Sequence, residues 1–245
     1  CRPVEEGPAE LAVIGLVAKV DTDFTLHEHV APSGTEGQIV RSFRASDVES
    51  TLDPEIDAAH EEVKEGLESL DAAFDTDATG RFDAPRGAKA ATPQQVVNGE
   101  RSLAILRRVL PVLPGAGTLA GRHWRFAAEE RIPLPGGAFA QMVLSGQYRL
   151  RGVVEEQDRV CAVVDLEYTG VASGTSADSG VSGELTGTCA GSGIYLVDLA
   201  DGSVWRGQVI ENRRLRVDLT RGRDTIWAEQ KTRTAYDIRA SDEDA

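Results

Sequence analysis

The chain has 245 residues, a formal net charge of −14, 41% hydrophobic residues and 5% aromatic residues. This apolar content can bury a core, which excludes global disorder, and no apolar run is long enough to predict a transmembrane helix. The acidic balance argues against nucleic-acid binding, because phosphate binding depends on clustered lysines and arginines. We therefore expect an acidic, folded protein.

The first part of the chain predicts short antiparallel strands. Residues 11–20 are apolar, and residues 23–30 and 38–44 alternate apolar and polar side chains around a turn at 32–34, which predicts a hairpin. A second hairpin is predicted over residues 70–83, where alternating apolar residues precede an Asp/Gly-rich turn.

Two helices are predicted. Residues 53–66 have apolar side chains at helical spacing and a proline in the first turn. Residues 93–110 give the stronger pattern, because Thr92 and Gln95 have the spacing of a capping box and Pro111 ends the apolar face.

From residue 122 onward the pattern predicts only strands, joined by short turns that imply antiparallel pairing. The Gly/Ser-rich residues 170–183 predict a flexible connection, and Asn212-Arg213 predicts a turn. The expected strands are 122–132, 138–153, 159–170, 182–199, 203–210, 214–220 and 224–239.

These elements predict an α+β fold in which a strongly curved, half-barrel-like antiparallel sheet has two helices packed on or closing it. We expect a tether at 1–10 and one domain at 11–240, followed by a disordered tail at 241–245. Within the domain, an acidic half (11–92) precedes a β-meander half (111–240).

Cys1 is the basis of a localisation hypothesis. An N-terminal cysteine followed by a polar, Pro/Gly-containing stretch is typical of processed bacterial lipoproteins, so Cys1 predicts a lipid anchor in the bacterial cell envelope. Arg2 takes the place of the aspartate that is associated with inner-membrane retention, which favours the outer membrane, on its periplasmic or surface side.

Cys161 and Cys189 remain as a pair in two neighbouring predicted strands. An envelope location permits disulfides, so we expect these two thiols to be bonded. The alternative is two separate buried thiols that act as small apolar side chains.

Four patterns resemble catalytic or ligand-binding motifs, but each lacks a required part. Residues 187–191 match a nucleophile elbow without the following helix, and 115–120 match a dinucleotide loop without the preceding strand. Residues 75–80 begin like a calcium loop whose twelfth position is an arginine, and His27 and His29 lack further metal ligands. We predict no catalytic residue, no metal and no cofactor.

Trp124, Trp205 and Trp227 all lie in predicted strands. In a chain with few aromatic residues they are expected to anchor the core, and on an open concave sheet they would instead line a cavity.

Three features then carry a resemblance: the D-x-x-G hairpin at 77–82, the helix that ends at the Pro-rich 111–115, and the G-x-x-W strand start at 121–124. In this order they resemble a group of uncharacterised bacterial lipoproteins. The pattern is also similar to periplasmic lipoprotein and lipid-carrier half-barrels, a resemblance that implies an acyl chain held by a curved sheet.

We therefore expect a membrane-anchored lipoprotein with a non-catalytic binding or scaffolding role. The alternatives are a carrier of a lipid or other hydrophobic ligand and, third, an extracytoplasmic hydrolase or metal-dependent enzyme. The expected partners are the membrane through the lipid on Cys1, and a hydrophobic small molecule or another envelope protein.

Overall fold

A computed structural model describes the chain outside its two ends and several connections. The tether, residues 11–19, the expected helix at 53–66 and the tail at 241–245 lie outside the described residues. The described residues are 20–32, 39–52, 71–76, 82–85, 100, 103–114, 120–134, 138–178 and 180–240.

The described strands form two antiparallel sheets that share no strand. The small sheet has the order β1-β2-β3-β4, and comprises β1 (Val20–Pro32), β2 (Ile39–Leu52), β3 (Asp71–Thr76) and β4 (Phe82–Pro85). The large sheet has the order β10-β9-β8-β7-β6-β5, and comprises β5 (His123–Pro133), β6 (Phe139–Glu156), β7 (Arg159–Asp178), β8 (Val181–Asp198), β9 (Val204–Arg221) and β10 (Asp224–Arg239).

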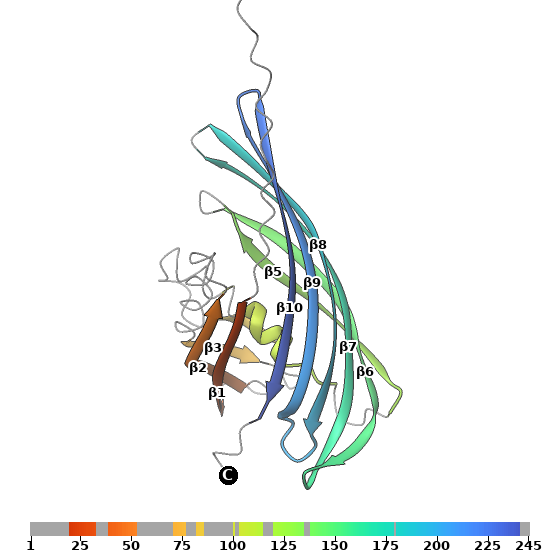
Figure 1. The fold of residues 1–245 in the computed structure, drawn as a ribbon. Helices are drawn as coiled ribbons and strands as arrows, with labels where there is room; N and C mark the ends of the chain where they lie inside the picture. The colour runs from red at the N-terminus through yellow and green to blue at the C-terminus, as the bar shows by residue number, and fades with distance from the viewer. Residues whose placement is uncertain are drawn as a thin grey trace, which may run out of the picture.

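A short helix, described over residues 103–109, lies between the two sheets (Figure 1). It ends before Pro111, as the sequence predicts, because proline cannot continue a helical hydrogen-bond pattern. The small sheet thus covers the helix on one side and the large sheet covers it on the other (Figure 1).

The structure confirms the antiparallel, β-dominated fold and both predicted hairpins, and it corrects the shape of the large sheet. The sheet is long and open, and neither sheet curls strongly enough to form the expected half-barrel. Since β5 and β10 are both edge strands of the large sheet, nothing in the pairing draws its two edges together.

Two local predictions were wrong. Residues 170–178 are not a flexible connection but the second half of β7, paired with β8 from Gly170 to Asp178. Asn212 is not in a turn, because its backbone pairs with Ala190 on one side and Arg233 on the other. Pairing with β8 along all of residues 170–178, with β6 as far as Ser173, and on both sides of Asn212 overrides the local turn preference of Gly, Ser and Asn.

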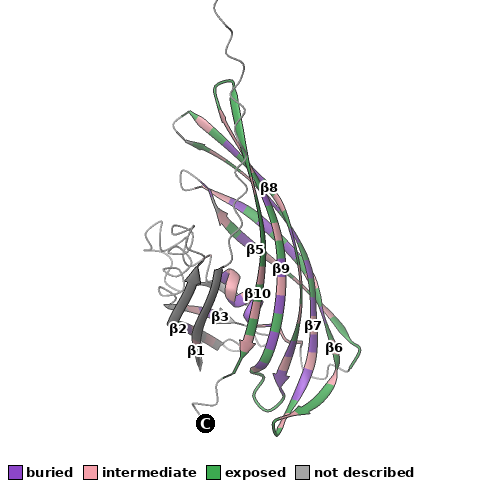
Figure 2. Ribbon diagram, viewed as in Figure 1, coloured by how far each residue is buried: buried purple, intermediate pink, exposed green. Residues whose placement is uncertain are grey.

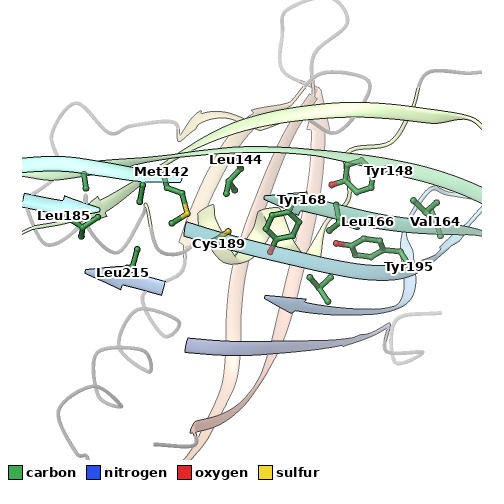
Figure 3. Close-up of a cluster of buried hydrophobic side chains, with 14 of the residues drawn as sticks. Met142, Leu144, Tyr148, Val164, Leu166, Tyr168, Leu185, Cys189, Tyr195 and Leu215 are labelled. Atoms are coloured by element: carbon green, nitrogen blue, oxygen red, sulfur yellow. The ribbon is translucent and has the colours of Figure 1, made fainter. Parts of the chain in front are cut away.

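One face of the large sheet carries the main core. Along β6, buried and exposed residues alternate over most of the strand (Figure 2). Every second side chain therefore points to the covered face of the sheet. Tyr148, Leu166, Tyr168 and Tyr195 come from three neighbouring strands and lie on the same side of the sheet (Figure 3).

Glycines on that face make room for the tyrosines. A Cβ on Gly191 would stand 2.2 Å from Cζ of Tyr168, and one on Gly146 would stand 2.6 Å from Cβ of the same residue. Both distances lie far inside van der Waals contact, so the Tyr168 ring lies directly over the backbone of its neighbours. The Gly-rich sequence of β8 is therefore required by the packing, and does not signal flexibility.

A second core joins the helix to the small sheet. Leu103 and Leu106 of the helix pack against Phe43 of β2 and Phe74 of β3, and all four side chains are buried. The two phenylalanine rings are 6.2 Å apart at their centroids. The helix therefore contributes Leu103 and Leu106 to the core of the small sheet, while its Arg108 side chain reaches strands β5 and β9 of the large sheet.

Candidate functional site

Arg108 fixes the helix on the large sheet through a buried guanidinium group. The side chain donates to both carboxylate oxygens of Glu130 on β5, to Oε2 of Glu211 on β9 from Nε (3.0 Å) and Nη2 (2.7 Å), and to the carbonyl oxygen of Ala104 (3.0 Å). A guanidinium group has five N–H donors, and here each has an acceptor.

Glu211 is the centre of this network. Besides Arg108, it accepts a 2.6 Å hydrogen bond from the hydroxyl of Tyr168 and a 2.9 Å bond from Arg213, and it lies 3.8 Å from Sγ of Cys189. Burial alone would raise the pKa of Glu211, but the charges of Arg108 and Arg213 outweigh it and hold that pKa below its usual range.

The network contains two arginines and two glutamates, so its formal charges cancel. Arg108, Glu130 and Glu211 are each at most 3% exposed. Burying charges is tolerated when they are paired and hydrogen-bonded, and leaving one of them unpaired is expensive. The arrangement therefore acts as a latch between the helix and strands β5 and β9, which we call the Arg108 latch.

The groups around the latch are held in their neutral forms. Burial, followed by the charge of Glu211, raises the pKa of the Cys189 thiol to about 12. Burial also raises the pKa of the Tyr168 hydroxyl. At neutral pH, Cys189 is therefore a thiol and not the thiolate that nucleophilic chemistry needs.

A cavity of about 540 Å³ lies beside the latch, between the helix and the β5 edge of the large sheet. Its size is within the range of natural small-molecule sites. Its wall combines apolar and polar groups in nearly equal measure, and the polar members come from the helix and from β5, β6 and β7. The lining residues are Arg107, Arg108, Leu110, Val112, Arg125, Phe126, Ala127, Ala128, Glu129, Val143, Leu144, Tyr148, Leu166 and Tyr168.

Tyr148 and the residues around it shape one end of the cavity. The Tyr148 hydroxyl accepts a 3.3 Å bond from the backbone N–H of Val112, and burial raises the pKa of this hydroxyl to about 12. Trp124 stacks on the Tyr148 ring, with centroids 5.4 Å apart, and donates from Nε1 to the carbonyl oxygen of Val112 (2.8 Å). The loop after the helix is thus hydrogen-bonded to the sheet.

The three tryptophans have different positions, and none is among the residues that line this cavity. Trp124 stacks on Tyr148, which does line the cavity. Trp205 is buried under the guanidinium group of Arg159, whose Cζ is 4.3 Å from the ring centroid. Trp227 is 52% exposed and contacts Arg216.

The predicted disulfide is not formed. In the β7–β8 register Cys161 lies opposite Asp198, and Cys189 lies opposite Gly170. The nine residues from Cys161 to Gly170 span about 30 Å of extended strand, whereas a disulfide needs Cα atoms about 4.4–6.8 Å apart. Both thiols are free and buried, as in the alternative interpretation. The strands are adjacent as expected, but the register separates the thiols.

The weak motifs gain no support as functional sites. Residues 187–191 continue within β8, and residues 115–119 and 77–80 lie outside the described residues. His27 bonds Ser46 through Nε2 at 2.8 Å, and His29 lies on the same strand. Within the described ranges, no group of three metal-ligating side chains is present and no helix has the length and hydropathy to cross a membrane.

Sequence reasoning missed the latch, although one signal was available. Trp124, Phe126, Ala128 and Ile132 alternate along the covered face of β5, and Glu130 interrupts this series at an inward position. A carboxylate at such a position requires a buried partner. The sequence alone does not show that the partner is Arg108, 22 residues earlier on the helix.

Comparisons with known proteins identify no relative: no family model matches the chain, no curated protein matches it, and no solved structure matches the fold.

Proposed function

We propose that this protein binds a small, largely apolar molecule in the cavity between the helix and the β5 edge, and that it does so without catalysis. The cavity carries this proposal, because its volume of about 540 Å³ suits a drug-sized or single-chain ligand. Leu110, Val112 and Phe126, which are half-buried, supply apolar surface that such a molecule would cover.

The polar groups beside the cavity favour binding over reaction. The donors of Arg108 are engaged with Glu130, Glu211 and a carbonyl oxygen, and Cys189 is protonated at neutral pH. A nucleophile would need a lowered pKa or an adjacent base with free capacity. The latch instead gives the cavity a rigid wall, which reduces the entropy lost when a ligand binds.

This proposal corresponds to the alternative that the protein carries a lipid or another hydrophobic ligand. Like the binding or scaffolding role that the sequence favours first, it involves no catalysis. It does not depend on a half-barrel, because the cavity is formed by the helix, the loop after it and strands β5, β6 and β7. The lipid anchor on Cys1 is a separate prediction, and Cys1 lies outside the described residues.

The test is a titration with the neutral fluorophore N-phenyl-1-naphthylamine. Ala128→Phe places a ring on the cavity-facing side of β5, and Ala177→Phe places the same ring on an exposed position of β7 as a control. We expect saturable binding to the wild type and to the control, and a loss of at least tenfold in affinity for Ala128→Phe with a retained unfolding transition. Wild-type affinity in a folded Ala128→Phe variant would contradict the proposal.

A further inference from the structure

We propose that the protein forms a two-fold symmetric dimer in which strand β10 of one copy pairs antiparallel with β10 of a second copy. β10 is an edge of the large sheet, at the end of the strand order opposite to β5 (Figure 1). Along the part of the chain that the structure describes, no strand pairs with its outer side. Such an edge offers a row of backbone donors and acceptors to another chain.

The three other edge strands of the described sheets are each protected against pairing. β4 has only four residues and ends at Pro85, and β1 has an irregular register and ends at Pro32. β5 ends at Pro133, and one of its backbone acceptors, the carbonyl oxygen of Glu129, is taken by Arg107 at 2.6 Å. Shortness, prolines, irregularities and covering groups are the devices by which native sheets block their edges.

β10 has none of these devices. It is 16 residues long, contains no proline, and keeps an unbroken register with β9 from Asp224 to Arg239. Between residues 224 and 233 every residue except Glu229 is exposed, on both faces of the sheet. Ile226 and Trp227 belong to this segment and are 49% and 52% exposed. A second strand laid along the edge would remove part of this apolar surface from water.

The backbone groups that point to the open edge follow from the pairing with β9. The N–H of Ala240 donates to the carbonyl oxygen of Trp205 at 2.9 Å, one step beyond the last register pair, Arg239 with Arg206. In an antiparallel pair, every second residue directs both of its backbone groups at the partner strand. The even-numbered residues of β10 therefore bond to β9, and the odd-numbered residues present N–H and C=O to the open edge.

The charges on these odd-numbered residues make β10 complementary to itself. With the two-fold axis at Gln230, Glu229 lies opposite Lys231 of the second copy. Trp227 then lies opposite Arg233, which places a cation beside an indole ring. Moving the axis by one residue sets Glu229 against Glu229 or Lys231 against Lys231, and like charges directly opposite each other destabilise a strand pair.

The balance of charge and the number of hydrogen bonds favour a second copy as the occupant. β10 carries as many basic as acidic side chains, although the whole chain has a net charge of −14. Pairing over residues 225–235 forms roughly twelve backbone hydrogen bonds, and ordinary interfaces have about 10 ± 5. The assembly closes at two copies, because each copy uses its one unprotected described edge.

The experiment is sedimentation equilibrium of the full chain at physiological ionic strength. The variants Glu229→Lys and Lys231→Glu each set like charges opposite each other on both sides of the two-fold axis. The controls are Glu167→Lys on β7 and Arg149→Glu on β6, which make the same changes in net charge at exposed positions away from β10. All variants should keep the wild-type unfolding transition, since exposed ion pairs contribute little to stability.

We expect the wild type and both controls to form dimers, and each β10 variant to raise the Kd of the dimer by at least about tenfold. An equimolar mixture of the two β10 variants should form the dimer again, because each cross-strand pair then joins one acidic and one basic side chain. A wild type that is monomeric at every soluble concentration, a dimer that both β10 variants retain, or a mixture that stays monomeric would overturn this inference.

Discussion

Replacing Arg108 with methionine tests the latch directly. The substitution keeps a long apolar side chain but removes all five donated hydrogen bonds. Among the described residues, Glu130 then keeps only Arg213, at 3.6 Å, while Glu211 keeps Arg213 and the Tyr168 hydroxyl. Breaking a buried pair from one side costs about 3–5 kcal/mol. In a chain of this size such a loss lowers the melting temperature by on the order of 10 °C.

The pH dependence separates this explanation from simple loss of packing. In the wild type, the pKa of Glu211 is lowered in the folded state. A lowered folded pKa stabilises the protein above the unfolded pKa, which is about 4.3 for glutamate, and the benefit is lost as the pH falls through the folded pKa. In Arg108→Met, Glu211 stays buried with one charged partner fewer, so the burial that raises its pKa is less fully opposed; the penalty is therefore largest at high pH and shrinks as the pH falls and this carboxylate takes up a proton.

The assay is urea unfolding of the wild type and Arg108→Met at pH 8 and pH 5, in parallel with Arg149→Gln as a surface control. We expect a loss of about 3–5 kcal/mol at pH 8 and a smaller one at pH 5. The triple variant Arg108→Met/Glu130→Gln/Glu211→Gln should recover part of the loss at pH 8, because it leaves no buried charge from these residues. A penalty below about 1 kcal/mol, typical of a surface pair, or one independent of pH would refute the reasoning.

Three further predictions concern packing, the thiols and the anchor. Gly191→Ala should destabilise the protein by about 1–3 kcal/mol, since its Cβ would stand 2.2 Å from the Tyr168 ring; Gly152→Ala, where no atom lies within 4 Å, is the matched control in thermal melting. Cys189, with a pKa raised to about 12, should resist iodoacetamide at pH 8 until urea unfolds the chain. Because both described thiols are free, a reductant should leave the melting temperature unchanged, and a lower melting temperature after reduction would contradict this. Cys1→Ser should release the full precursor from membranes in a Gram-negative host, and unchanged membrane retention would refute the anchor.

Alternating apolar residues and recognisable turns allowed much of the sheet to be predicted from the sequence. The pattern from residue 138 to 153 gave most of β6, because an exposed and a buried face impose a period of two. Proline at 111 correctly marked the end of the helix. These features depend on residues close together in the chain, which a single sequence shows.

The errors and omissions depend on residues far apart in the chain. The Gly/Ser-rich part of β7 is a strand because β8 pairs with it from Gly170 to Asp178 and β6 pairs with it as far as Ser173, and Gly170 has Leu144 directly against its backbone. The cysteine pairing failed because it needed the register, which no local pattern fixes. The latch joins Arg108 to Glu211 across 103 residues of sequence, so only the folded arrangement shows that these charges meet.

The position of the helix between two cores has a consequence for the dynamics of the molecule. Leu103 and Leu106 belong to the core of the small sheet, while Arg108 belongs to the wall of the cavity. An opening that moves the helix away from both sheets breaks the Arg108 latch and exposes the small-sheet core together, so we expect the two events to form one cooperative unit in native-state hydrogen exchange. If the cavity binds a ligand as proposed, that ligand at 100 times its Kd should suppress such an opening by about 2.7 kcal/mol. Amide protons of β2 and β3 should then exchange about a hundredfold more slowly, although the ligand touches neither strand.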